Sequence, residues 1–251
     1  MNQKKTAILN QFKSRYIAHR GLFNNNTNAP ENTIAAFKNA VKAGFGIELD
    51  IQLSKDKQVV VAHDYSLKRI CGIEKEISEL SYQEICKYNI LNSKEKIPLL
   101  TDVLSLVSGK VPLLIELKAE KNCKELCSLA AKILNSYSGV YCIESFSPFA
   151  VGWFKKHQPN VVRGQLADDF SGKKYFKSAL KNWILTNMFF NAIYKPDFIA
   201  YNHEVGSKKC IKFWKKKLGC FLAAWTITSQ EELDRAAKLF DILIFDSFMP
   251  V

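Results

Sequence analysis

Residues 15–64, RYIAHRGLFNNNTNAPENTIAAFKNAVKAGFGIELDIQLSKDKQVVVAHD, contain the features that decide the fold. Two of the four histidines of the chain, His19 and His63, each follow a short apolar run there. Another apolar run contains Glu48 and Asp50, two residues apart. Because side chains alternate along a strand, residues two apart point to the same face. The sequence therefore predicts a strand that presents two carboxylates on one side.

A hairpin is predicted directly after this strand. The apolar run at 59–62 is strand-like, and only residues 54–58 separate it from the strand before it. A parallel crossover needs roughly a dozen residues, so the two runs are expected to pair antiparallel. If Asp56-Lys57 forms a two-residue turn, Asp50 lies opposite His63. The prediction depends on this register, because a slip of one residue would move His63 to the other face.

The predicted face combines His63 with Glu48 and Asp50. Clustered carboxylates repel one another unless a cation joins them. A divalent metal ion would meet this need, and oxygen ligands suit Mg²⁺ or Ca²⁺ better than Zn²⁺. An exposed sheet face with ordinary charges is the alternative explanation. The sequence thus predicts a candidate site for one divalent cation, Mg²⁺ or Ca²⁺.

Strand-like runs alternate with helix-like segments along the whole chain. Apart from the hairpin strand, the predicted parallel strands begin near residues 15, 46, 111, 140, 161, 197, 220 and 241. This series, interleaved with helices, predicts an α/β fold, a (β/α)₈ TIM barrel. No linker or internal repeat divides the sequence. We therefore expect a single domain over residues 1–251, with a short insertion at about 65–98 after the hairpin.

Charge and cysteine content restrict the class of partner. The formal net charge of +12 favours anionic partners such as phosphoesters or lipid headgroups. The sequence carries no zinc-finger, helix-turn-helix or aromatic-interleaved RNA-binding motif, so nucleic acid is not expected as a partner.

The seven cysteines follow neither a disulfide framework nor a zinc spacing, which is typical of a reducing compartment. Since the first apolar stretch is too short for a signal peptide, a cytoplasmic location is predicted.

Residues 173–194 form a basic, aromatic and amphipathic stretch. The polar residues within it interrupt the apolar run too often for a membrane span. One interpretation is a barrel helix that packs its apolar face on the sheet. The other is an interfacial helix that touches an anionic membrane, which would make the protein membrane-peripheral.

The ordered motifs of the chain resemble those of the glycerophosphodiester phosphodiesterase family, of the bacterial cytosolic type. The closely matching motifs are His19-Arg20-Gly21, Pro30-Glu31-Asn32-Thr33, Glu48-Leu49-Asp50, His63-Asp64 and Glu116-Leu117-Lys118. Looser matches are Ser145-Phe146-Ser147-Pro148, Trp225-Thr226 and Asp246. Each motif alone is weak, but the set occurs in the order of the family and spans nearly the whole chain.

The resemblance implies a role for particular residues of this sequence. His19 and His63 would be the catalytic acid and base. Glu48, Asp50 and Glu116 would hold the metal ion. The resemblance does not decide which histidine is the acid and which is the base.

Further residues would bind the substrate. Arg20 and Lys118 would contact the phosphate, and Trp225 lies where the family has an aromatic residue near the substrate. The segment 65–98 varies within the family and shapes the pocket. It offers Tyr65, Arg69 and Tyr82 as unranked candidates for choosing the alcohol group.

The reaction that the resemblance implies is metal-dependent hydrolysis of a glycerophosphodiester to sn-glycerol 3-phosphate and an alcohol, within lipid and glycerol metabolism. Water or a glycerol hydroxyl could be the attacking group. Lysophospholipase D-like action on membrane lysophospholipids is an alternative that uses the same site. A non-catalytic barrel that binds phosphodiesters or membranes is another, although two titrating histidines argue against it. The sequence predicts neither the alcohol nor the oligomeric state.

Overall fold

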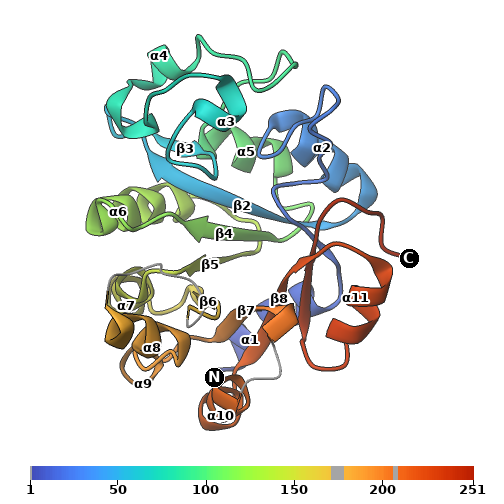
Figure 1. Cartoon of the computed structure of the whole chain (residues 1–251), viewed down its shortest axis with the longest axis vertical. Helices are drawn as coiled ribbons and strands as arrows, with labels where there is room; N and C mark the ends of the chain where they lie inside the picture. The colour runs from blue at the N-terminus through green and yellow to red at the C-terminus, as the bar shows by residue number, and fades with distance from the viewer. Residues whose placement is uncertain (1, 171–177, 206–208) are drawn as a thin grey trace. The chain divides into compact units, whose positions relative to one another are not determined.

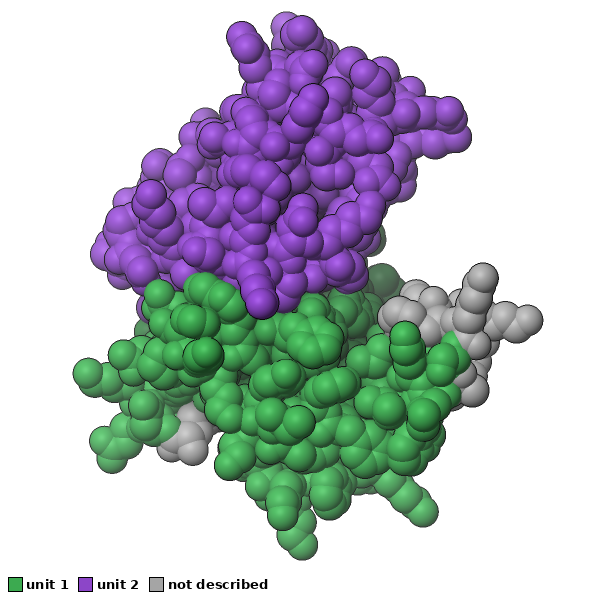
Figure 2. Space-filling view, turned by 90° about the vertical axis from the view of Figure 1, so that its left-hand side faces the viewer, with its two compact units in different colours: residues 1–16, 142–251 green, residues 17–141 purple. Residues whose placement is uncertain are grey.

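The computed structural model describes residues 2–170, 178–205 and 209–251 (Figure 1). Eight parallel strands alternate with helices along the chain, and one further strand is antiparallel. This pattern is the predicted (β/α)₈ barrel class. The chain divides into two compact units, coloured separately in Figure 2. Unit 2 comprises residues 17–141, and unit 1 comprises residues 1–16 and 142–251. The prediction of a single domain stays a prediction.

Unit 2 contains residues 17–64, nearly all of the stretch that decides the fold. Its elements are β1 (Ile17–Ala18), α2 (Ile34–Ala43), β2 (Gly46–Leu53), β3 (Val59–Val61), α3 (Lys68–Cys71), η1 (Ile77–Glu79), α4 (Tyr82–Ile85), α5 (Leu100–Val107), β4 (Leu113–Leu117) and α6 (Cys123–Leu134). Strand β2 pairs in parallel with β1 and with β4, and antiparallel with β3. Every residue of β2 and β4 is buried, so polar side chains on these strands need partners.

Helix α2 begins and ends at residues suited to those places. The Thr33 hydroxyl accepts a hydrogen bond from the backbone N–H of Ala36, and Gly44 ends the helix with φ +77°. Gly21 lies against the first turn with φ +83°, and a Cβ there would lie 3.0 Å from atoms of Ala36 and Phe37. A glycine is therefore required after Arg20, since it allows the loop from β1 to pack closely on α2.

The predicted hairpin is present, but its predicted register is wrong by one residue. Leu53 pairs with Val59, and the backbone N–H of Ser54 donates to the carbonyl of Gln58. The loop is therefore three residues long, and Lys57 adopts φ +64° within it. A three-residue loop with a left-handed residue is a common alternative to the two-residue turn. Asp50 consequently lies opposite Ala62, whose N–H donates to the Asp50 carbonyl.

Residues 65–98 form a small layer with a hydrophobic core of its own. The buried members include Leu67, Ile70, Ile77, Leu80, Ile85, Ile90 and Ile97, together with Val60 of β3 and Ala62. These residues come from α3, η1, α4 and the loops between them. The layer is thus packed on the hairpin strand, which fixes the segment that follows His63.

Unit 1 contains a second series of parallel strands and helices. Its elements are α1 (Gln3–Lys13), β5 (Tyr141–Ser145), α7 (Pro148–His157), β6 (Val162–Ala167), α8 (Ala179–Thr186), α9 (Asn191–Tyr194), β7 (Phe198–Asn202), η2 (His203–Val205), α10 (Lys209–Leu218), β8 (Phe221–Ile227), α11 (Gln230–Ala236) and β9 (Ile242–Phe245). Strands β5 to β9 pair in parallel in sequence order. No helix in the described part of the chain is long and apolar enough to cross a membrane.

A buried ion pair attaches α1 to the strands of unit 1. The ammonium of Lys5 donates to Asp197 at 2.8 Å and to the Val161 carbonyl at 3.1 Å. Asp197 also accepts from the backbone N–H of Arg163 at 3.1 Å. The three side chains of Lys5, Asp197 and Arg163 are all buried. This cluster holds the amino-terminal helix in place.

The predicted basic and aromatic stretch is only partly described, because residues 173–177 lie outside the described residues. The remainder forms α8 and α9. Side chains of Leu180, Trp183, Phe189 and Ile193 are between 45% and 64% exposed. Thr186, Met188 and Asn191 are buried, so the described part of the stretch has both packed and exposed side chains.

Candidate active site

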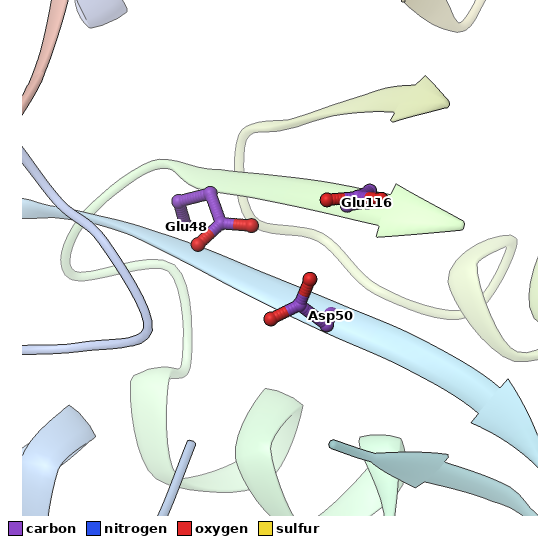
Figure 3. A group of neighbouring side chains, drawn as sticks. All are labelled: Glu48, Asp50 and Glu116. Atoms are coloured by element: carbon purple, nitrogen blue, oxygen red, sulfur yellow. The ribbon is translucent and has the colours of Figure 1, made fainter. Parts of the chain in front are cut away.

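Three carboxylates of unit 2 lie together on two adjacent strands (Figure 3). Glu48 and Asp50 project from β2, and Glu116 projects from β4. Asp50 and Glu116 are direct partners in the parallel ladder. One oxygen from each of the three lies within 4.8 Å of the others, and all three residues are buried. The predicted candidate metal ligands are therefore brought together.

Lys118 lies among these carboxylates. Its ammonium is 2.7 Å from Oε1 of Glu116 and 2.9 Å from Oδ1 of Asp50. Burial alone would lower the pKa of Lys118, but the two carboxylates raise it, so the ammonium is charged. Lys118 follows Glu116 by two residues, which places both on the same side of the β4 end.

The pKa values of two carboxyl groups of the cluster are shifted in opposite directions. Burial would raise the pKa of Asp50, but the charges of Lys118, His63 and Arg20 hold it well below its ordinary value. Burial raises the pKa of Glu116 to about 7, because the charge of Asp50 adds to burial while Lys118 opposes it. Asp50 is thus the constant anion of the cluster, and Glu116 is the carboxyl group that a proton can occupy.

His19 and Arg20 follow β1 and lie over Glu48. The Nε2 atom of His19 is 3.9 Å from Oε2 of Glu48, and the backbone N–H of Arg20 donates to that oxygen at 3.0 Å. Arg20 adopts φ +55°, a conformation that is uncommon for a residue other than glycine. Its guanidinium donates to Glu31 at 2.6 Å and approaches Asp50 at 3.7 Å. The left-handed turn therefore directs both the backbone and the side chain of Arg20 to acidic groups of the site.

His63 lies near Asp50 despite the corrected register. Strand β3 ends at Val61, so His63 is outside the ladder and its direction does not follow strand alternation. The buried side chain of Gln52 donates to the carbonyls of Ala62 and Asp64, at 2.8 and 2.9 Å. Burial lowers the pKa of His63, whereas the charge of Asp50 opposes this shift. The Gln52 side chain thus fixes the main chain around His63, which lies near Asp50 without being its partner in the ladder.

Several residues that support the site were not assigned a role from the sequence. Asn32 donates to Oδ2 of Asp50 at 2.9 Å and is buried with φ +56°. Asp64 contacts His63, and Arg69 contacts both Asp64 and Glu31. The family motifs quoted above include Glu31, Asn32 and Asp64, so the sequence already marked these positions as candidates for a role in the site. Arg69 comes from the variable segment, where the sequence offered it only as an unranked candidate for the alcohol group.

Trp225 belongs to unit 1. Its ring packs edge to face against Phe146, with ring centres 5.7 Å apart, and Phe146 contacts Phe170 at 6.3 Å. Phe146 directly follows β5, and Phe170 follows β6. Trp225 is therefore part of an aromatic cluster at the carboxyl ends of strands, and its predicted contact with substrate stays a prediction.

Comparisons with known proteins identify the family. The model of the glycerophosphoryl diester phosphodiesterase family matches residues 19–246. A glycerophosphodiester phosphodiesterase of Caldanaerobacter subterraneus is 31% identical over 239 residues, which cover 90% of this chain and 90% of that protein. The chain belongs to the glycerophosphodiester phosphodiesterase family. It is an enzyme of that class, a phosphodiesterase that acts on glycerophosphodiesters.

Solved structures show the same fold. A glycerophosphodiester phosphodiesterase of Thermotoga maritima has a TM-score of 0.70 at 25% identity, covering 92% of this chain and 93% of that one. A phosphodiesterase of Oleispira antarctica, in complex with the product sn-glycerol-3-phosphate, has a TM-score of 0.76 at 21% identity, with 92% of each chain covered.

Part of the chain is also similar in sequence to a lysophospholipase D. The protein of Homo sapiens is 38% identical over 125 residues, which are 45% of this chain and 38% of that protein.

Proposed function

We propose that the site of unit 2 hydrolyses glycerophosphodiesters to sn-glycerol 3-phosphate and an alcohol, with one divalent cation and two histidines. The observation that carries this proposal is the joint placement of His19 and His63 beside the three buried carboxylates. Phosphoryl transfer needs positive charge near the phosphate and groups that move protons. The site contains candidates for both.

The carboxylate cluster fits a hard divalent cation. Its donors are oxygens, and one carboxylate oxygen from each of Glu48, Asp50 and Glu116 lies within 4.8 Å of the other two. Glu48, Asp50 and Glu116 would hold Mg²⁺ or Ca²⁺. A bound ion of this kind polarises the phosphoryl group and offsets its developing negative charge.

The basic residues of the site would bind the phosphate. The guanidinium of Arg20 offers planar hydrogen bonding, and the ammonium of Lys118 offers a compact charge. Both already lie beside acidic groups, which hold them in position. Trp225 would supply an apolar surface for the substrate.

The histidines would move the protons of the reaction. One takes a proton from the attacking oxygen, which forms a bond to phosphorus. The other gives a proton to the alcohol oxygen as its bond to phosphorus breaks. The attacking oxygen belongs to water or to a glycerol hydroxyl, and in the second case water opens a cyclic phosphate afterwards.

The test measures release of glycerol 3-phosphate from glycerophosphocholine, glycerophosphoethanolamine and glycerophosphoglycerol, with Mg²⁺, Ca²⁺ or EDTA. We expect His19→Ala, His63→Ala and Glu48→Ala each to lower the rate by at least about a hundredfold, since each removes a proton-transfer group or a ligand. His157→Ala is the control, because His157 is exposed at the end of α7. Full activity in EDTA would contradict metal dependence, and full activity of either histidine variant would contradict its catalytic role.

A second candidate is lysophospholipase D-like action at a membrane, and an exposed surface of unit 1 favours it. We define the α7–α9 patch as Phe149, Leu180, Trp183, Phe189 and Ile193. Trp183 packs on Phe189 with ring centres 4.8 Å apart, and Phe149 packs on Phe190 at 5.8 Å. The sequence from 170 to 196 contains five lysines and neither Asp nor Glu. Exposed aromatic residues in a segment whose sequence is rich in lysine suit an anionic lipid surface.

Vesicle sedimentation separates this candidate from the first. We expect binding to phosphatidylglycerol vesicles, little binding to phosphatidylcholine vesicles, and at least about a tenfold loss of binding in Trp183→Ala/Phe189→Ala. The rate on soluble glycerophosphocholine should not change in this variant. Phe213→Ala, on the exposed side of α10, is the matched control. Equal binding by the double variant and the wild type would exclude the α7–α9 patch as the membrane contact.

We also propose a cytoplasmic location, with membrane contact as the peripheral alternative. The seven cysteines form no disulfide with one another in the described part of the chain, and Cys127, Cys142 and Cys220 are buried. This pattern agrees with a reducing compartment, in which disulfides are rare.

A further inference from the structure

A continuous set of hydrogen bonds joins His63 to residue 69. The Nδ1 atom of His63 lies 2.6 Å from Oδ1 of Asp64. The other carboxylate oxygen of Asp64 accepts from Nε of Arg69 at 2.6 Å. The two terminal nitrogens of Arg69 donate to the two oxygens of Glu31, at 2.7 and 2.8 Å. All three nitrogens of the Arg69 guanidinium are thus engaged by carboxylates.

We propose that Arg69 is a positioning residue that acts through Asp64: it holds His63 in the tautomer with its proton on Nδ1 and leaves Nε2 for the reaction. The inference rests on the proposed role of His63. It gives the segment 65–98 a part in the chemistry, in addition to its expected influence on the alcohol group.

The chemistry of Asp64 determines the tautomer. Burial would raise the pKa of Asp64, but the hydrogen bonds from Arg69 and His63 lower it. Asp64 is therefore an ionised carboxylate near neutral pH and can only accept. A neutral His63 that bonds to it must donate from Nδ1, so Nε2 carries the lone pair.

Gln52 and Arg69 have separate effects on His63. Gln52 bonds to the carbonyls on either side of His63 and fixes the main chain there. This clamp leaves the ring free to turn about its own side-chain bonds. The bond from Asp64 restrains the ring, and Arg69 in turn restrains Asp64, which has 25% of its side chain exposed.

Arg69 is itself held from two directions. The next residue of α3, Ile70, is buried in the hydrophobic layer of residues 65–98. Glu31 is only 5% exposed and also accepts from Arg20 and Asn25. A guanidinium that bridges two fixed carboxylates is well ordered, because its planar fork matches their geometry. Such supporting residues typically affect activity by about ten- to a hundredfold.

The first test needs no substrate. Long-range ¹H–¹⁵N spectra of the histidine-labelled protein report which ring nitrogen carries the proton, and only four histidines have to be resolved. His63→Gln identifies the signal of His63. We expect a proton on Nδ1 of neutral His63 in the wild type, and a mixture of tautomers in Asp64→Asn and Arg69→Ala. An unchanged tautomer in Arg69→Ala would overturn the proposal.

The second test is a kinetic cycle on glycerophosphocholine. We expect Arg69→Ala to lower kcat by about ten- to a hundredfold with KM changed by less than about threefold, and Asp64→Asn to lower kcat at least as much. The double variant should be no worse than Asp64→Asn alone, because Arg69 acts through Asp64. Arg69→Lys should recover part of the loss, since it keeps the charge without the fork.

Lys68→Ala is the matched control. Lys68 is the neighbour of Arg69 in α3 and pairs with exposed Glu74, so its loss should leave kcat unchanged. Thermal melting of every variant excludes unfolding as the cause. Losses that multiply in the double variant, or an effect on KM alone, would make Arg69 a substrate contact and overturn the proposal. If the wild type hydrolyses no diester, the proposed function fails, and the tautomer spectra still decide the positioning of His63.

Discussion

At the scale of single residues, the site depends on side chains that are neither candidate metal ligands nor candidate acid–base groups. Asn32 and Arg20 both adopt left-handed backbone conformations, with φ of +56° and +55°. Such conformations are costly for residues with a Cβ and persist where surrounding contacts hold them. Asn32 bonds to Asp50, and Arg20 bonds to Glu48 and Glu31. The strained loop thus positions two of the three carboxylates.

Asn32 should influence the affinity of the site for a metal ion. We expect Asn32→Ala to weaken Mg²⁺ or Ca²⁺ binding by about ten- to a hundredfold, because Asp50 loses the donor that orients it. Calorimetric titration of the substrate-free protein measures this directly. Asn39→Ala, an exposed position of α2, serves as control. An affinity equal to that of the wild type would show that Asn32 does not position Asp50.

Glu31 should contribute stability that disappears in acid. Burial would raise its pKa, but hydrogen bonds from Arg69 and the charge of Arg20 lower it from 4.5 to about 2. A lowered pKa in the folded state contributes free energy of unfolding. This contribution is complete above about pH 4.5 and is lost as the pH falls towards 2. Urea unfolding should therefore show a pH-dependent difference of about 3 kcal/mol between the wild type and Glu31→Gln, present at pH 6 and absent near pH 2. A difference that does not change with pH would contradict this account.

At the scale of elements, the hairpin and the layer after it decide where His63 lies. The three-residue loop sets the ladder, β3 ends at Val61, and Gln52 then clamps the chain around His63. The hydrophobic layer of residues 65–98 continues from this point and supports Arg69. His63 is therefore positioned by the hairpin loop, the Gln52 side chain and the layer that follows, and not by strand pairing alone.

The buried ion cluster that attaches α1 to unit 1 leads to a prediction about stability. Asp197 neutralises two buried cations, Lys5 and Arg163, so Asp197→Asn should destabilise the protein by about 3–5 kcal/mol. Glu231→Gln should change the stability by less than about 0.5 kcal/mol, because the pair of Glu231 with Arg235 is exposed. Urea unfolding of both variants measures the difference. Equal midpoints would mean that the buried cluster does not anchor α1.

At the scale of the whole molecule, the (β/α)₈ fold places polar groups at the ends of buried strands. Active sites of such barrels form at the carboxyl ends of the strands, where loops supply the variable parts. Glu116 and Lys118 follow this rule at the end of β4, and His19 follows it after β1. The fold therefore explains how motifs that are distant in sequence could serve the one reaction proposed above.

Metal binding should stabilise the folded protein in the absence of substrate. A ligand present at a hundred times its Kd adds about 2.7 kcal/mol if it binds only the folded state. We expect the melting temperature to rise with Mg²⁺ or Ca²⁺ in the wild type, and to rise much less in Glu116→Gln, which lacks one candidate ligand. An equal rise in both proteins would indicate binding elsewhere. Differential scanning fluorimetry against EDTA provides the measurement.

The sequence by itself determined the class of fold and brought the three carboxylates of the candidate site together. The eight parallel strands lie where the apolar runs predicted them, because parallel strands covered on both faces are mostly apolar. The pairs Glu48 with Asp50 and Glu116 with Lys118 share their faces because strand alternation is a local rule. The motifs and their order along the chain indicated the family.

Only the tertiary structure decided the register and the supporting contacts. The turn after Leu53 could form with two residues or three, and in the observed three-residue loop Asp56 accepts from the Ser54 hydroxyl and from the backbone N–H of Tyr82 in α4. The bonds of Arg69 to Asp64 and Glu31 join segments that are separate in sequence. No local pattern specifies such contacts, because they depend on where packing places each segment. The tautomer proposed for His63 depends on the same contacts.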